Sequence, residues 1–399
     1  MYKPSPDILK KYAQVLVNFA LNSGEGIKKG EVVAVHADTS ALPLLQQTVK
    51  TILLSGGNPI VRMTDESLSK LLYENASDEQ LKFFPKKYVK AFIDTIDHRI
   101  ALLSDQDPLH LKDIDPKKIM LSNASASITR KWLFAKEDAG KLTWTLALYG
   151  TPGMAKEAGL SLEEYWQEII RACFLDKPNP VETWKEVFAE LERLRARLSA
   201  MLINKLHITA KDTDLWITVG KNRKWMGGSG RNIPSFELFT SPDWRGTQGH
   251  IFFDYPLYRY GSIIKDITLR FEKGRVVHAT ASKNENLLKQ LIKQKNADKI
   301  GEYSLTDKRY SRIKAFMANT LYDENIGGKW GNTHLAVGTS YHDAYTGDVG
   351  AMKDKDWARL GFNESPEHTD LLATSRRSVE ATMRDGTTKL IYQDGIFLL

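Results

Sequence analysis

The first half of the chain alternates between two hydrophobic patterns. A short β-branched run, GEVVAVHAD, precedes a helical pattern, ALPLLQQTVKTILLSG, which Gly56 and Gly57 end, and a second strand-like run, NPIVRMT, follows. This order predicts a βαβ unit. A helix-strand passage in YVKAFIDTIDHRIALLSD, a buried strand in TWTLALYGTP and helices in LSLEEYWQEIIRACFLD and NPVETWKEVFAELERLRARLSAMLINK continue the alternation. We therefore expect residues 1–205 to form an N-terminal α/β domain with a mostly parallel sheet.

From about residue 206 the pattern changes to short strands separated by Gly and Asn turns. The segments LHITA and DLWITVG are strand-like, and ITLRFEKGRVVHATA predicts two antiparallel strands joined by a tight turn at Lys273 and Gly274. Two helical patterns, ENLLKQLIKQK and YSRIKAFMANTLYD, come next. Residues 206–399 are therefore expected to form a C-terminal α+β domain.

Composition agrees with two folded domains and adds little else. A chain of 399 residues exceeds one ordinary core, and 42% hydrophobic with 26% charged residues is typical of globular proteins. The single cysteine, Cys173, allows no internal disulfide and favours a reducing compartment. A cytoplasmic location is the expectation.

The net charge of +7 does not by itself indicate a nucleic-acid partner. Lys and Arg are scattered among Asp and Glu, and the densest basic run, Lys221, Arg223 and Lys224, is short. The first residues show amphipathic helical spacing, and no segment reaches the roughly 18 apolar residues that cross a bilayer. We therefore expect neither a nucleic-acid nor a membrane partner.

Acidic and histidine side chains beyond residue 236 supply the candidate chemistry. They are Glu237, Glu302, Glu324, His334, His368 and Asp370. His368 and Asp370 stand at i and i+2, which on an extended strand places both side chains on one face. Carboxylate oxygens mixed with imidazole nitrogens suit a divalent ion, zinc or cobalt first, with manganese or magnesium as alternatives. The sequence thus predicts a metal-dependent hydrolase.

The local contexts support these candidates. Glu237 in RNIPSFELFTSP and Glu302 in KIGEYSLTD have apolar neighbours, where a carboxylate needs a partner. His334 lies in the strand-like NTHLAVGTSYHDAY, and Tyr341, seven positions later, has a hydroxyl that can stabilise an oxyanion. His342 points away from Tyr341 if the strand continues, so we interpret it as a non-ligand.

Other catalytic signatures are missing from the sequence. It has no Gly-x-Ser-x-Gly elbow, no phosphate-binding loop and no His-Glu-x-x-His helix. The remaining histidines show no partner pattern, and we interpret them as structural; they are His36, His98, His110, His207, His250 and His278.

The order of these motifs resembles the thermophilic metalloaminopeptidase family, which includes aminopeptidases T and S and PepS-like enzymes, almost from end to end. RNIPSFELFTSP resembles its Asn-hydrophobic-Pro, Glu and Phe-Thr-x-Pro signature, and GEYSLTD its Gly-Glu-hydrophobic segment. LYDENIGG with NTHLAVGTSY resembles its Asp-Glu-Asn, His, Ala, Gly and Tyr run, and NESPEHTDLL its terminal His-x-Asp.

The resemblance implies a two-domain homodimer whose C-terminal domain holds two divalent metal ions per chain and releases N-terminal amino acids from peptides. The implied metal ligands are Glu237, Glu302, His334, His368 and Asp370. Tyr341 is implied as catalytic, and Glu324 as a general base or as a residue that orients a ligand. We expect the two ions to activate a water molecule and Asp370 to bridge them.

Two other functions remain open at this point. The same kind of site serves metal hydrolases that act on other amides or esters, because fold and metal do not fix the substrate. A degenerate site in a non-catalytic binding module is the second alternative.

Overall fold

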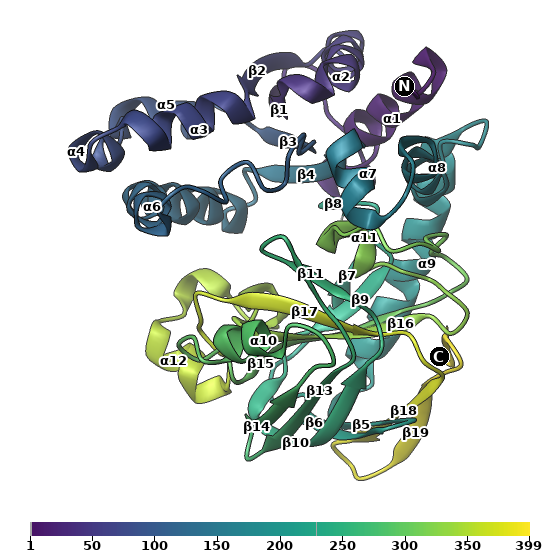
Figure 1. Cartoon of the computed structure of the whole chain (residues 1–399). Coiled ribbons are helices and arrows are strands. Elements are labelled where there is room, and N and C mark those ends of the chain that lie inside the picture. Colours follow the sequence, from purple (N-terminus) through teal and green to yellow (C-terminus); the bar gives the residue numbers. More distant parts are fainter. Residues whose placement is uncertain (1, 229) are drawn as a thin grey trace. The chain divides into compact units, whose positions relative to one another are not determined.

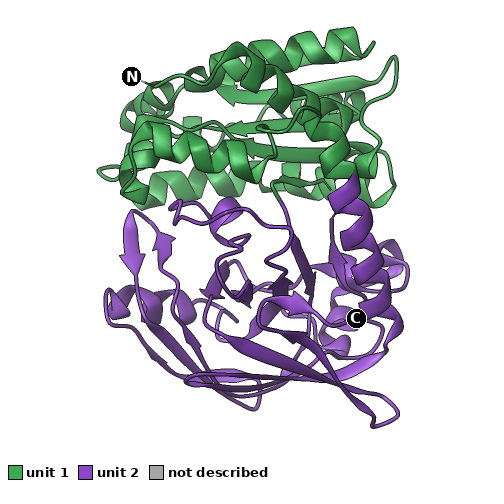
Figure 2. Cartoon of the chain, turned by 90° about the vertical axis from the view of Figure 1, so that its right-hand side faces the viewer, with its two compact units in different colours: residues 1–185, 229–234 green, residues 186–228, 235–399 purple. Residues whose placement is uncertain are grey.

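The computed structural model describes residues 2–228 and 230–399. The chain divides into two compact units, residues 1–185 with 229–234 and residues 186–228 with 235–399 (Figure 2). Helix α9 (Pro180–Ala200) begins in unit 1 and continues in unit 2. The boundary expected after residue 205 falls within strand β5 (Ile203–Ala210) of unit 2.

Unit 1 is built on a five-stranded parallel sheet, which confirms the predicted α/β class. Its strand order is β2 (Asn58–Thr64), β1 (Val32–Asp38), β3 (His98–Leu103), β4 (Thr143–Leu148) and β8 (Asn232–Ile233). The helices of unit 1 before α9 are α1 (Pro6–Asn18), α2 (Leu42–Leu54), α3 (Glu66–Asn75), α4 (Asp78–Lys82), α5 (Lys86–Thr95), α6 (Pro116–Asp138), α7 (Pro152–Ala158) and α8 (Leu162–Ala172) (Figure 1). The predicted βαβ unit is β1-α2-β2.

Sequence patterns missed the longest helix of unit 1. Helix α6 spans 23 residues and buries none of them. Because a helix without a buried stripe shows little hydrophobic periodicity, the pattern that reveals an amphipathic helix is weak here. Its Asp115 side chain caps the first turn by accepting from the Lys117 N–H.

Unit 2 is mostly antiparallel, as expected for an α+β domain. The larger sheet has eight strands in the order β14 (Arg275–Thr280), β13 (Ile267–Glu272), β10 (Asp243–Phe253), β6 (Thr213–Thr218), β5, β18 (Arg377–Met383), β19 (Thr388–Gln393) and β20 (Ile396–Phe397). The smaller has five, in the order β17 (His368–Ala373), β16 (Asn332–Gly338), β15 (Ile300–Thr306), β9 (Glu237–Thr240) and β7 (Met226–Gly227). A hairpin, β11 (Leu257–Arg259) and β12 (Ser262–Ile264), and helices α10 (Glu285–Ile292), α11 (Thr320–Asp323) and α12 (Asp354–Leu360) complete the unit.

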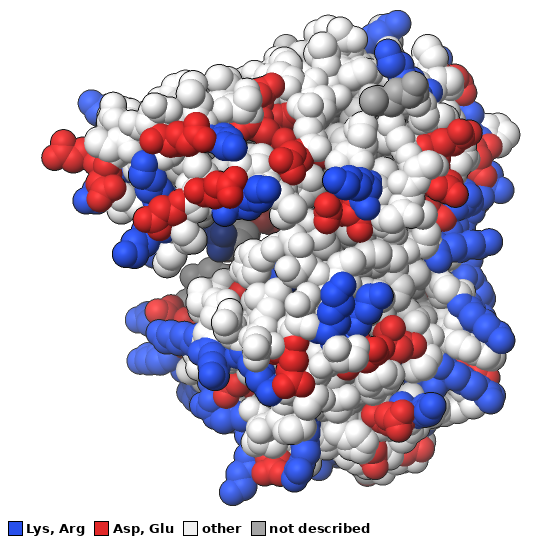
Figure 3. Space-filling model, viewed as in Figure 1, with Lys and Arg blue, Asp and Glu red and all other residues white. Residues whose placement is uncertain are grey.

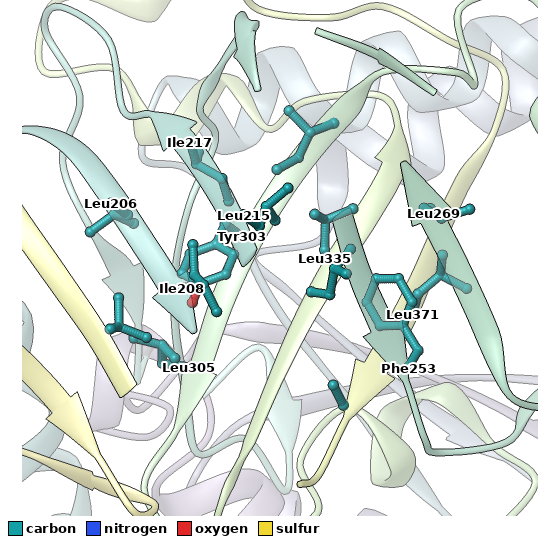
Figure 4. Close-up of a cluster of buried hydrophobic side chains, with 14 of the residues drawn as sticks. Leu206, Ile208, Leu215, Ile217, Phe253, Leu269, Tyr303, Leu305, Leu335 and Leu371 are labelled. Atoms are coloured by element: carbon teal, nitrogen blue, oxygen red, sulfur yellow. The ribbon is translucent and has the colours of Figure 1, made fainter. Parts of the chain in front are cut away.

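The core of unit 2 joins one face of the five-stranded sheet to the larger sheet (Figure 4). Tyr303, Leu305 and Leu335 of the smaller sheet are fully buried in the same cluster as Ile208 and Leu269 of the larger one. Since successive side chains of a strand point to opposite faces, residues 302, 304 and 334 must face away from this core. The alternation of apolar residues thus places the candidate ligands Glu302 and His334 on the opposite face of the five-stranded sheet.

Two local predictions in unit 2 are wrong. Residues 310–323 were expected to be helical, but only Thr320–Asp323 form a helix. The Asp323 carboxylate accepts from the backbone N–H groups of Met317 and Asn319, so side-chain bonds replace helical ones in this buried loop. The strand through His334 ends at Gly338, and His342 starts a 3₁₀ turn and stacks on Trp357 with ring centroids 3.9 Å apart.

Surface and helix properties add two observations. Basic and acidic side chains are interspersed on the face of the molecule drawn in Figure 3. Among the helices of the described residues, none combines the length and the apolarity needed to cross a membrane.

Candidate metal centre

Strand register brings the predicted ligands together on one face of the five-stranded sheet. Strand β15 lies between β9 and β16, with Thr306 opposite Glu237 and Ser304 opposite His334. Strand β16 lies between β15 and β17, and its Gly338 is opposite His368. Since positions two apart share a face, the five predicted ligand side chains emerge on the side away from the core.

A small residue forms the floor between these groups. Ala336 is paired with Glu302 on one neighbouring strand and with Asp370 on the other, and its side chain is fully buried. Gly338, two positions on, has φ +110, and a Cβ there would lie 2.0 Å from the carbonyl oxygen of Glu367. The methyl group of Ala336 leaves room above the sheet where longer side chains from β15 and β17 meet.

The donor atoms form two groups with one common member. His334 Nε2 lies 3.1 Å from Glu302 Oε1 and 3.1 Å from Glu237 Oε2. His368 Nε2 lies 3.5 Å from Glu302 Oε2 and 3.4 Å from Asp370 Oδ1. Within each group, one donor atom of each residue lies within 4.8 Å of the others. Glu302 belongs to both groups, whereas Asp370, which we expected from the sequence to be the shared carboxylate, belongs to one.

Burial makes this concentration of charge costly without a cation. Burial and repulsion by Glu237 raise the pKa of Glu302 to about 7, although His334 opposes the shift. Burial alone would lower the pKa of His334, but its hydrogen bonds to Glu237 and Glu302 raise it well above the usual range. The raised pKa of His334 favours its protonated form beside these carboxylates.

The second group also places a histidine next to a carboxylate, His368 beside Asp370. Burial opposes ionisation of both partners, but their attraction raises the pKa of His368 to about 9 and lowers that of Asp370 to about 2. Nδ1 of His368 is fixed by the carbonyl oxygen of Thr339 at 2.9 Å, which aims Nε2 at the carboxylates. Nδ1 of His334, by contrast, is buried and has no hydrogen-bond partner among the described residues. The donor set of three carboxylates and two imidazoles fits divalent cations that would take the place of the protons.

Glu324 lies beside the donor groups but belongs to neither. It follows α11, is 8% exposed, and has a pKa raised well above the usual range by burial and by repulsion from Glu237 and Asp370. Asn325 Nδ2 donates to Glu324 Oε1 at 3.3 Å, and Asn325 Oδ1 accepts from the backbone N–H of Phe236 at 2.6 Å. Asn325 thereby links the carboxylate of Glu324 to the segment that starts β9.

Tyr341 lies at the edge of the same site. Its ring centroid is 4.9 Å from that of His368 and 5.7 Å from that of Phe239, and its backbone N–H donates to Ser241 Oγ at 2.9 Å. The side chain is 43% exposed. Partial burial, with the carboxylates led by Glu302, raises its pKa, so the phenol remains a proton donor at neutral pH.

The structure adds a supporting pair that the sequence did not reveal. Glu367 is 3% exposed and pairs through Oε1 with Nη2 of Arg259 at 2.6 Å. It also accepts from Gln294 Nε2 at 3.0 Å and from the Thr369 hydroxyl. The only sequence signal was an acid directly before the His-x-Asp motif. This network attaches the β11–β12 hairpin and α10 segment to the strand that carries His368 and Asp370.

Comparisons with known proteins agree with this site. A family model described as thermophilic metalloprotease (M29) matches residues 6–397. The chain is 30% identical to aminopeptidase AmpS of Bacillus subtilis over 97% of both chains, and 26% identical to aminopeptidase T of Thermus thermophilus over 98% of this chain and 99% of that one. The solved structure of wild-type AmpT from Thermus thermophilus has a TM-score of 0.84 at 24% identity, over 98% of this chain and 99% of that chain, and shares the fold. The chain belongs to the thermophilic metalloprotease (M29) family.

Proposed function

We propose that this protein is a metal-dependent aminopeptidase that releases N-terminal amino acids from peptides at a dinuclear site. One observation carries the proposal: two buried donor groups share Glu302 on one sheet face, next to an acid and a phenol that belong to neither group. Similarity to proteins named aminopeptidases S and T supports the same class of substrate.

The ligands divide into two sets. Glu237, Glu302 and His334 would hold one divalent ion, and Glu302, His368 and Asp370 the other. Zinc or cobalt suits these oxygen and nitrogen donors best, with manganese and magnesium as alternatives. When bound, the ions would supply Lewis-acid polarisation of the scissile carbonyl and a lowered pKa for the attacking water.

Glu324 is proposed as the general base. Its raised pKa suits a carboxylate that takes a proton from the attacking water and returns it to the leaving amine. Asn325 Nδ2, donating to Oε1, holds the carboxylate in one orientation. Glu324 belongs to neither donor group, which separates this role from that of the metal ligands.

Tyr341 is proposed to stabilise the transition state. Because its pKa is raised, the hydroxyl keeps its proton and can donate it in a hydrogen bond to the oxyanion of the tetrahedral intermediate. A preference for free over blocked N-termini is part of the same proposal.

The test combines metal analysis with a matched pair of substrates. We expect about two ions per chain, hydrolysis of leucyl-p-nitroanilide that chelation abolishes and metal restores, and no hydrolysis of N-acetyl-leucyl-p-nitroanilide. Equal cleavage of both compounds would indicate another amide or ester hydrolase, and bound metal without turnover of either would contradict the proposed activity. The homodimer implied by the family resemblance is part of the proposal and is tested by light scattering.

A further inference from the structure

Unit 1 contains a cavity that is separate from the ligand set of unit 2. It lies between α6 and strands β3 and β4 and has a volume of about 980 Å³, at the upper end of the range for pockets that take small organic ligands. It exists because α6 runs beside the sheet without burying any residue, so the space beneath the helix is only partly filled. Leu142, with Leu133 packed nearby, forms its apolar end.

Positive charge lines the cavity without a matching acid. Arg99, Arg130 and Lys131 face it, and none of their side chains forms an ion pair or hydrogen bond with the described residues. The one lining carboxylate, Glu137, is already engaged, because it pairs with Arg231 at 2.6 Å and accepts from Trp144 Nε1 at 3.0 Å. The charge available to a ligand is therefore positive.

The strand neighbours of Arg99 increase this excess. Arg62 on β2 and His36 on β1 are paired in register, and Arg99 on β3 is paired with Ala34, two residues before His36. Positions 34, 36, 62 and 99 thus share the face that α5 and α6 cover. Burial and repulsion by Arg62 lower the pKa of Arg99, and the Nε2 atom of His36 is buried without a partner among the described residues. A half-buried guanidinium with no counter-ion is costly, and an anion would remove that cost.

The other lining groups select the kind of anion. Most are apolar, including Ala101, Leu142, Leu146 and the Trp144 ring, and Ser127, Thr129 and Thr145 add hydroxyls. No glycine belongs to the lining within the described chain, so the backbone cradle that usually holds a polyphosphate is missing. A free amino acid also fits poorly, since its ammonium group would meet three cations and Glu137 is occupied.

We propose that this cavity binds a carboxylate attached to an apolar chain whose neighbouring nitrogen is acylated, as at the C-terminal end of a peptide. Arg99 pairs with the carboxylate, Arg130 and Lys131 add longer-range attraction, and Trp144 and the leucines contact the apolar chain. This binding site does not rest on the proposed activity, and its occupation involves no chemical step.

The test uses N-acetyl-L-leucine and its amide as a matched pair, titrated by calorimetry into the full-length, metal-loaded protein. The carboxylate should bind at least about tenfold more tightly than the amide, because a charged hydrogen-bonded pair is lost in the amide. Free leucine should bind more weakly than N-acetyl-L-leucine. Equal binding of acid and amide, or tighter binding of free leucine or of inorganic phosphate, would overturn the proposal.

Variants place the binding in this cavity. Arg99→Gln should weaken binding about tenfold, while Glu302→Gln in the metal site should leave it unchanged, which excludes a carboxylate held by metal. Ala126→Trp, on an exposed lining position of α6, fills the cavity without removing charge and should weaken binding at least as much, so the test survives if Arg99→Gln fails to fold. Native affinity in a folded Arg99→Gln or Ala126→Trp protein would contradict the assignment, as would its loss in Glu302→Gln.

Discussion

One histidine in each unit meets opposite electrostatic surroundings. In unit 2, His334 lies between Glu237 and Glu302, and its pKa is raised well above the usual range although burial alone would lower it. In unit 1, burial together with Arg99 and Arg62 lowers the pKa of His36 to about 4. The same residue type is thus held charged in one place and neutral in the other. Neighbours, not residue type, decide what each region attracts: cations in unit 2 and anions in unit 1.

The largest expected effect tests whether Tyr341 in unit 2 takes part in catalysis and not in metal binding. Tyr341→Phe removes one hydroxyl that is not in either donor group, so we expect metal content to stay native while kcat falls about a hundredfold to a thousandfold. Turnover of leucyl-p-nitroanilide with metal analysis measures both. Unchanged turnover would remove Tyr341 from the mechanism, and lost metal would show that it supports the ligands instead.

The next effect tests whether the floor of the site must be small. Ala336→Leu places a larger side chain between Glu302 and Asp370, and overpacking there should lower the affinity for zinc about a hundredfold in competition with a chelator. Val337→Ala, the adjacent residue on the core face, is the matched control: it should lower the free energy of unfolding by about 1–2 kcal/mol and leave zinc affinity unchanged. Native zinc affinity in Ala336→Leu would contradict the proposed placement of the ions.

A smaller effect tests the positive charge that supports this acidic site. Arg259→Gln leaves the buried Glu367 without its ion-pair partner, next to His368. Zinc affinity should fall about tenfold, at the low end for residues that hold metal ligands in place. The double variant Arg259→Gln/Glu367→Gln removes both charges and should recover part of the loss. If the double variant is no better than the single one, the pair does not act through Glu367.

The last effect concerns the cationic region of unit 1 and is spread over a range of pH. The unfolded chain takes up a proton at His36 below its usual pKa near 6.5, but the folded protein does so only near pH 4. The free energy of unfolding should therefore fall as pH drops from 6.5 to 4, by at most about 1.4 kcal/mol per pH unit from this group. Urea unfolding at several pH values should show a shallower decline for His36→Leu than for the native protein. His278→Gln, at an exposed strand position, is the control and should keep the native slope.

Local patterns predicted most of the regular structure. The β1-α2-β2 unit follows from apolar runs ended by Gly56 and Gly57, and the β13–β14 hairpin from alternation around Lys273 and Gly274. Hydrophobic patterns failed where side-chain hydrogen bonds replace the backbone hydrogen bonds of a helix, or where a helix buries few residues. Hydrogen bonds to Asp323 hold the preceding loop in a non-helical conformation. Helix α6 buries no residue, so its sequence shows little hydrophobic periodicity.

The sequence by itself determined which residue types carry the chemistry and which of them share a strand face, because the i, i+2 spacing of His368 and Asp370 is a property of any extended chain. Only the tertiary structure decided that Glu302 joins both donor groups and that Arg259 supports Glu367. It also decided that Arg99 faces a cavity where no described residue supplies a counter-ion. These relations join residues from distant strands, and they depend on strand order and register, which local hydrophobic patterns do not specify.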